Sequence, residues 1–301
     1  MSVEEVTSGT SFTTPELRKP ARSQARIVWE NFIRNKLALV GGIVVVLLYL
    51  GAIFAPQLAP HDYAALNPGQ ALKGPSREYP LGTDRQTRDV LSRILVGSRT
   101  SLSVGFVAVV ILMTIGVLAG AVSGYFGGWV DNVIMRVVDI ILAIPLLLLL
   151  LLAVALFEPG LWTTMLVIGL TTWPATARLV RGEFLAAKNR DYVLAARALG
   201  AGPLRIMFRH LLPNTLAVII VQATLWLSFA ILLESSLSFL GLGVQPPEPS
   251  WGGMLADGQR NAREAPWLTI FPGMAIFITV LAFNLLGDGL RDAFDPRLRR
   301  R

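Results

Sequence analysis

Long apolar runs separated by short charged segments dominate the chain from residue 37 onward. Six stretches contain no Asp, Glu, Lys or Arg, and they cover residues 37–58, 100–123, 140–157, 161–177, 211–233 and 268–287. Each is about the length that a helix needs to cross a hydrocarbon core of roughly 30 Å. The pattern therefore predicts an all-α membrane protein with six transmembrane helices, the first of them over 37–58.

The segments before and after the first span differ in character. Residues 1–20 are polar and predict a disordered cytoplasmic tail. Residues 21–36 mix apolar with basic side chains, which favours an N-terminal interfacial helix over the alternative of an ordinary lead-in. Residues 59–99 are rich in Pro, Gly and polar side chains, and they predict an extracytoplasmic segment that ends in an amphipathic helix over 83–98.

The other five spans form a five-helix core over 100–290, which contains the loop over 181–213 and is followed by a basic tail over 291–301. If both termini lie on one side of the membrane, 19 of the 27 Lys and Arg residues lie on that side. The positive-inside rule then predicts cytoplasmic N- and C-termini. The net charge of +7 is explained by orientation in the membrane, so we expect membrane lipid and no nucleic acid as a partner.

Several residues inside the spans predict how the helices are shaped. Gly116, Gly120 and Gly124 recur every four residues, which removes side chains from one face and predicts close approach of another helix. Pro145 and Pro174 each remove a helical hydrogen bond, and they predict kinks in the third and fourth spans.

The cytoplasmic loop over 181–213 carries the densest signal in the chain. Asp191 is a candidate N-cap of a short helix over 192–199, and Gly200 would end that helix in the left-handed conformation. Pro203 suits the first position of a second short helix that leads into the fifth span. Small alanines beside larger side chains make a knob-like surface suited to a groove on a partner.

This loop resembles a known motif. Residues 191–200 read Asp-Tyr-Val-Leu-Ala-Ala-Arg-Ala-Leu-Gly, and 210–214 read His-Leu-Leu-Pro-Asn. The spacing is similar to the cytoplasmic coupling loop of binding-protein-dependent ABC importer permeases: Glu-Ala-Ala, three residues, Gly, nine residues, Ile, one residue, Leu-Pro. Leu194 stands where that family has Glu, and His210 where it has Ile.

Other segments resemble the C-type permease subunit of dipeptide and oligopeptide importers. They are residues 29–62, 79–93, 123–129, 233–243 and 287–296, so that the resemblance covers the chain from about Ala25. Thr87 stands where the family usually has Gly before Arg-Asp.

The resemblance implies a type I ABC importer permease fold in a bacterial cytoplasmic (inner) membrane. It also implies a role as half of a translocation pore for di- or oligopeptides. The partners would be a B-type permease subunit in a heterodimer, two ABC ATPase subunits and an extracytoplasmic substrate-binding protein. ATP and Mg²⁺ would bind to the ATPases, with no cofactor in this chain. Nickel chelates, glutathione or another small solute are the alternative cargoes. The residues expected to couple to the ATPases are Asp191, Tyr192, Ala195, Ala196, Leu199, Gly200, Arg205, Leu212 and Pro213.

Polar residues within the spans are candidates for contact with substrate. The candidates for lining the pore are Glu234, Ser235, Ser238 and Asn284. Glu234 is alone among apolar residues in the fifth span, and the alternative is that it packs against a neighbouring helix. Asp139 lies three residues after Arg136, which predicts an ion pair along one helix.

The residues offer no catalytic constellation. His61 and His210 are the two histidines, they lie far apart in the sequence, and the chain has no Cys, so we expect no metal site. A Gly-x4-Gly-Lys-Ser/Thr phosphate loop and a Gly-x-Ser-x-Gly motif are both missing, which argues against an enzyme. The distant alternative is an ion-coupled secondary transporter, which predicts paired buried charges and matching broken helices in two halves.

Overall fold

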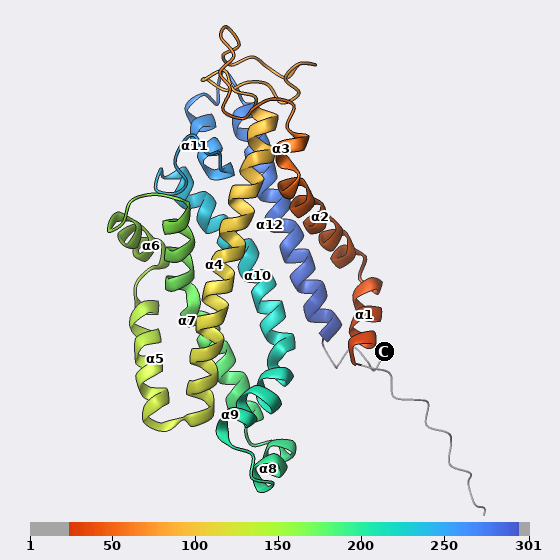
Figure 1. Ribbon diagram of the computed structural model, residues 1–301, viewed down its shortest axis with the longest axis vertical. Coiled ribbons are helices and arrows are strands. Elements are labelled where there is room, and N and C mark those ends of the chain that lie inside the picture. Colours follow the sequence, from red (N-terminus) through yellow and green to blue (C-terminus); the bar gives the residue numbers. More distant parts are fainter. Residues whose placement is uncertain (1–23, 295–301) are drawn as a thin grey trace, which may run out of the picture.

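The computed structural model describes residues 24–294 of the chain (Figure 1). The segments over 1–23 and 295–301 lie outside it, so the predicted disordered tail and most of the basic tail are not described. Residues 24–294 form helices and connecting loops without any strand, apart from an isolated bridge between Thr83 and Asp89. The predicted all-α fold class is confirmed.

Four long helices form the central bundle: α4 (Val90–Phe126), α7 (Leu161–Ala187), α10 (Leu212–Phe239) and α12 (Trp267–Phe294). Helix α4 packs along α7 and α10, and α10 packs along α12. Helix α2 (Lys36–Ile53) lies against α12 on the outside of the bundle (Figure 1). The helix α12 extends to Phe294, so the first residues of the predicted basic tail are helical.

The shorter helices lie at the side and at the two ends of the bundle. They are α1 (Gln24–Arg34), α3 (Ala55–Leu58), α5 (Gly128–Ala143), α6 (Leu146–Ala155), α8 (Asp191–Ala198), α9 (Pro203–Arg205), the π-helix η1 (Ile206–Leu211) and α11 (Trp251–Arg260). Helices α3 and α11 lie at one end, whereas α8 and α9 lie at the other end, toward which α1 and the C-terminal end of α12 also point (Figure 1).

Fewer helices meet the length and hydropathy of a membrane span than the six expected. Within residues 24–294 these are α2, α4, the continuous run Pro203–Phe239 and α12, with the bent pair α5 and α6 as a fifth if it counts as one span. The predicted fourth span lies in α7, where several threonines and Pro174 lower the hydropathy. These threonines bond within the helix: the Thr172 hydroxyl donates to the Ile168 carbonyl at 2.6 Å.

The third predicted span is broken rather than kinked. Helix α5 ends at Ala143, α6 begins at Leu146, and their axes differ by 90°. Ile144 is extended because the ring of Pro145 excludes the helical conformation from the residue before it. Helix α7, by contrast, continues through Pro174.

The first part of the predicted amphipathic helix over 83–98 is a turn. The Asp84 carboxylate accepts hydrogen bonds from the backbone N–H groups of Gln86 at 2.8 Å and Arg88 at 2.9 Å. Thr87 is left-handed, with φ +67°, which gives a physical reason for the usual Gly at this position. The helix begins only at Val90, where the Asp89 side chain accepts from the N–H of Ser92, and it runs without interruption into the second span.

The glycine-lined face of α4 is where the central bundle is tightest. A Cβ on Gly116, Gly120 or Gly124 would lie 2.9, 2.5 and 2.9 Å from backbone carbonyl oxygens of α7. Real Cβ atoms do not come this close to such oxygens, so only glycine allows the two backbones to touch here. The predicted close approach is confirmed, and α7 is the partner helix.

Candidate functional site

The segment between α7 and α10 forms the tip of the bundle farthest from α3 and α11 (Figure 1). Helix α8 begins at Asp191, and the residue in the N-cap position is Arg190, with φ −74° and ψ 150°. The prediction that Asp191 caps this helix is therefore wrong. Asp191 occupies the first helical position, where its carboxylate still interacts favourably with the positive end of the helix dipole.

The C-terminal end of α8 is a Schellman motif. Gly200 has φ +81°, its N–H donates to the Arg197 carbonyl at 3.0 Å, and the Ala201 N–H donates to the Ala196 carbonyl at 3.0 Å. Both bonds satisfy carbonyls that the end of a helix leaves open. The predicted left-handed glycine is confirmed, as is Pro203 as the first residue of α9.

A π-helical turn connects this tip to the bundle. The sequence predicted an ordinary second helix, but Ile206–Leu211 adopts π geometry before α10 begins at Leu212. Ile206, Met207 and Leu211 from this turn are buried. Such wide turns occur mostly at functional sites, and this one joins the tip to a long helix without a flexible linker.

One face of α8 is anchored in the subunit. Val193 is fully buried and belongs to a hydrophobic cluster with Val180 and Phe184 of α7 and Ile206 of the π-turn. Burying a valine side chain contributes roughly 1.5–3 kcal/mol. The short helix therefore keeps a defined orientation although it lies at the tip of the bundle.

Exposed apolar side chains lie on α8, at its C-terminal end, on α9 and on the π-turn. Leu199 is 88% exposed and Leu204 67%, and Leu194 and Phe208 are also exposed. Apolar side chains gathered on a surface mark a site of contact with another molecule. Leu194, Leu204 and Phe208 were not predicted as contact residues, although the four-residue spacing of Leu204 and Phe208 places both on one helical face.

Some of the predicted coupling residues are exposed, and others are buried or half-buried. Those on the surface are Asp191, Tyr192, Ala195, Leu199, Gly200, Arg205 and Pro213. Ala196 is buried and Leu212 half-buried, so these two support the loop from inside. The knob expected from paired alanines is thus formed by Ala195 with its exposed apolar neighbours.

An ion pair braces the base of this loop. The Arg181 guanidinium on α7 donates from Nε and Nη2 to the two carboxylate oxygens of Asp131 on α5, each at 2.6 Å. The Ser123 hydroxyl also donates to Asp131, and Lys188 Nζ donates to the Gly124 carbonyl at 3.2 Å. Bidentate pairs fix geometry as well as charge. This bracket holds together α4, α5 and the end of α7 that leads to α8.

Replacing Asp131 with Asn is expected to weaken the bracket and lower transport. The amide loses the charge that Arg181 requires, and we expect a cost of about 1–3 kcal/mol because the pair is only partly shielded from water. Uptake by cells and protein level in the membrane are the measurements. Asp139→Asn is the matched control, since Asp139 forms an exposed pair. Equal uptake in both variants would contradict a positioning role for Asp131.

Asp139 pairs with a residue of another helix. The sequence predicted an ion pair with Arg136 along α5, but the Asp139 carboxylate lies 2.5 Å from Nη2 of Arg178 on α7. The prediction was wrong because it considered neighbours along one helix and could not include a facing helix.

The predicted pore residues of α10 lie inside the subunit. Glu234 is fully buried, and its carboxylate accepts hydrogen bonds from the hydroxyls of Ser238 at 2.7 Å and Ser235 at 3.3 Å. Asn284 of α12 is half-buried and lies beside Ser228 of α10, with a hydroxyl-to-amide distance of 3.2 Å. The surroundings of Glu234 agree with the packing alternative, and a role in the pore stays a prediction.

Two substitutions of Glu234 separate packing from substrate contact. Glu234→Gln keeps an oxygen that can accept from Ser238, so we expect normal protein level and normal uptake if the group only packs. Glu234→Leu leaves the serine hydroxyls unpaired in the interior, at roughly 1–3 kcal/mol, and we expect a lower protein level. Impaired uptake by Glu234→Gln at a normal level would instead support contact with the substrate.

Trp251 links α11 to the bundle from the opposite end. Its side chain is buried, and its indole N–H donates to the Ile94 carbonyl of α4 at 3.1 Å.

Within residues 24–294 no group of three or more His, Cys, Asp or Glu residues is arranged to hold a metal ion.

Comparisons with known proteins agree with this architecture. The family described as "Binding-protein-dependent transport system inner membrane component" matches residues 113–300, and the "N-terminal TM domain of oligopeptide transport permease C" matches residues 23–75. A dipeptide transport system permease protein of Alkalihalophilus pseudofirmus is 45% identical over 95% of this chain and 94% of its own length. A glutathione transport system permease protein of Pectobacterium atrosepticum is 43% identical over 95% of this chain and 96% of its own length.

An oligopeptide transport system permease protein of Bacillus subtilis is 45% identical over 89% of this chain and 88% of its own length. Among solved structures, a chain of the inward-facing MetNI methionine ABC transporter aligns with TM-score 0.57 and 20% identity, over 67% of this chain and 96% of that chain. The likeness to this solved structure concerns the fold alone, and the fold is that of a type I ABC importer permease.

The matching segments include both the N-terminal helices and the loop with α8. The chain belongs to the family of binding-protein-dependent transport system inner-membrane components, within the branch of C-type permease subunits of ABC importers. It is a multi-pass membrane protein and a permease subunit of an importer.

Proposed function

We propose that this permease subunit forms half of a translocation pore for short peptides. The observation that carries the proposal is the combination of 45% identity to a dipeptide permease and an equal identity to an oligopeptide permease, each over about nine-tenths of the chain or more. Substrate choice in such importers would rest largely on the separate binding protein. Glutathione is the second candidate, supported by the 43% identity to a glutathione permease.

The tip around α8 is the proposed contact with the ATPase subunits. Its support is physical: exposed Leu199 and Leu204 offer an apolar surface, while buried Val193 and the π-turn tie that surface to α7 and α10. A push on α8 would therefore move two long helices together. The residues proposed to make or shape this contact are Asp191, Tyr192, Ala195, Ala196, Leu199, Gly200, Arg205, Leu212 and Pro213.

The remaining assignments follow from this arrangement. The partners would be a B-type permease subunit, two ATPases that bind ATP and Mg²⁺, and an extracytoplasmic binding protein. The tip, α1 and the C-terminal end of α12 lie toward one end of the bundle (Figure 1). This end would face the cytoplasm, as the distribution of Lys and Arg along the sequence predicts. This chain would bind no cofactor and catalyse no reaction.

The decisive experiment is purification of the tagged chain in mild detergent, followed by uptake assays in vesicles. We expect a second permease and ATPases to co-purify, and a labelled dipeptide to enter vesicles only with internal ATP and the cognate binding protein. Excess unlabelled dipeptide should compete with the label, whereas glutathione should not. Competition by glutathione alone would favour the second candidate. Uptake driven by an ion gradient without ATP would contradict both.

A further inference from the structure

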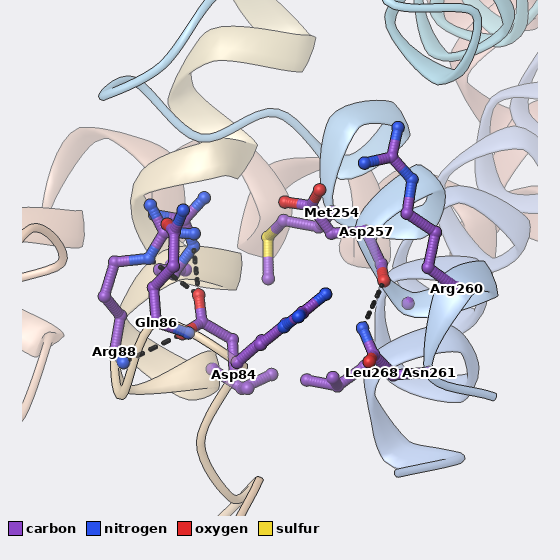
Figure 2. A pocket seen from close by; sticks show the side chains of 12 residues that line it. Asp84, Gln86, Arg88, Met254, Asp257, Arg260, Asn261 and Leu268 are labelled. Atoms are coloured by element: carbon purple, nitrogen blue, oxygen red, sulfur yellow. Dashed lines mark hydrogen bonds and ion pairs between the residues drawn. The ribbon is translucent and has the colours of Figure 1, made fainter. Parts of the chain in front are cut away.

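A cleft opens at the end of the bundle opposite α8. One wall is the turn over 83–89 with the first turn of α4, and the other is α11 with the start of α12. Figure 2 shows Asp84, Gln86 and Arg88 on the first wall, facing Met254, Asp257 and Arg260 on the second. The cleft has a volume of about 330 Å³, near the lower end of the range of small-molecule sites.

Asp84 is held by hydrogen bonds within its own turn. One carboxylate oxygen accepts from two backbone N–H groups, and the other accepts from Nε of Arg88 at 2.7 Å. The ion pair of Asp84 and Arg88 is buried on both sides. Arg88 is therefore the main partner of Asp84, and Arg93 is a more distant one.

Arg93 lies at the base of the cleft with an unsatisfied guanidinium. Its side chain is 7% exposed, and Nε lies 3.7 Å from Asp84, beyond hydrogen-bonding distance. Its buried Nη1 atom has no hydrogen-bond partner among residues 24–294. A buried guanidinium without a full set of acceptors is costly, and the geometry of this group matches a carboxylate. The cost is explained if a ligand carboxylate completes the site.

Both walls of the cleft carry charged side chains of each sign. Four arginines line it, at positions 85, 88, 93 and 260, against the two aspartates Asp84 and Asp257. Asp84 Oδ2 lies 2.7 Å from Nε of Arg88 and 3.7 Å from Nε of Arg93, so two arginines share one carboxylate and one positive charge remains there. Asp257 is exposed on the α11 wall, and no described residue donates a hydrogen bond to its carboxylate. The cleft thus offers a buried cation and, across from it, an accessible anion.

We propose that this cleft binds a small zwitterion, with its carboxylate on Arg93 and its ammonium group on Asp257. A short peptide with free ends has this chemistry, and the choice of a peptide rests on the proposed function. In the proposed orientation the cleft faces the extracytoplasmic side, so it would hold substrate by its charged ends outside the membrane-spanning part of the bundle.

Binding of labelled dialanine to the importer complex in nanodiscs, without ATP or binding protein, tests the proposal. We expect dialanine amide, which lacks the carboxylate, to bind about tenfold or more weakly than dialanine. Arg93→Gln should weaken dialanine by a similar factor and abolish the preference for the acid over the amide. Arg99→Gln is the matched control on the same helix: it removes an exposed arginine outside this cleft and should bind as the wild type.

A second variant covers the possibility that Arg93→Gln does not fold. Asp257→Asn changes an exposed side chain, so the protein level should stay normal. It should weaken dialanine but leave N-acetyl-dialanine, which has no ammonium group, unchanged. If Asp257→Asn has no effect on dialanine, or if the wild type binds the acid and the amide equally, the proposal is overturned. The same holds if wild-type complex binds no dialanine.

This test is independent of the proposed transport function. ATP-driven uptake of peptide without binding in this cleft would overturn the cleft proposal alone. Binding in the cleft by a complex that imports no peptide would overturn peptide import and leave the zwitterion site standing.

Discussion

Gly120→Val is expected to reduce the amount of importer in the membrane severely. A Cβ at this position would lie 2.5 Å from the Ala177 carbonyl oxygen and 2.8 Å from the Val180 Cβ, so α4 and α7 must separate. Overpacking of a tight interior costs about 1–3 kcal/mol, and valine adds two further methyl groups to the clash. Immunoblots of membranes and thermal unfolding of the purified complex measure the effect.

Gly51→Val is the matched control for this substitution. Gly51 also lies in an apolar helix, α2, but a Cβ there would meet nothing within 4 Å. We expect a normal protein level from this variant, because the added side chain meets no neighbour. The two variants are matched because each replaces a glycine with the same valine. Equal levels of the two variants would show that the α4–α7 contact is not as tight as described.

Gly200→Val is expected to uncouple transport from ATP hydrolysis. Gly200 ends α8 at φ +81°, a conformation that costs a side-chain-bearing residue roughly 1–2 kcal/mol and a β-branched one more. No atom lies within 4 Å of a Cβ at this position, so the effect would come from the backbone rather than from a clash. The Schellman bonds would open, and the connection from α8 to α9 would change direction. We expect uptake to fall at least tenfold while the complex still assembles and hydrolyses ATP.

Gly202→Val is the matched control, because it also replaces a glycine of this loop with valine but at a position where the backbone is not left-handed. Gly202 has φ −72° and ψ 166°, which valine adopts readily, and a Cβ there would also meet nothing within 4 Å. This variant should transport like the wild type. Full uptake by Gly200→Val, or an equal loss in both variants, would contradict the role of the Gly200 conformation in coupling.

Predictions from the sequence succeeded where a signal is local. The apolar runs indicated a membrane protein because their length and lack of charge are properties of the segment alone. Gly200 and Pro203 were placed correctly because each has a backbone preference that neighbours along the chain cannot change. The glycine repeat of α4 predicted a close contact, although not which helix makes it.

Predictions failed where a local signal had more than one structural outcome. Pro145 predicted a kink, but whether a proline bends or ends a helix depends on what packs around the freed carbonyls. Residues 83–98 have an amphipathic pattern, which predicted a helix over the whole segment. The Asp84 carboxylate instead accepts hydrogen bonds from backbone N–H groups of the turn over 83–89, and the helix begins only at Val90. Thr87 in the left-handed conformation could not be inferred from a residue type that rarely adopts it.

The sequence by itself determined that the chain is a membrane protein and where α8 ends and α9 begins, because these depend on hydropathy and backbone preference over a few residues. Only the tertiary structure decided which charges meet. Asp139 pairs with Arg178 rather than Arg136, and Asp131 pairs with Arg181. Each pairing depends on how two helices are rotated against each other, and many basic residues are within reach of a carboxylate until that rotation is set by packing.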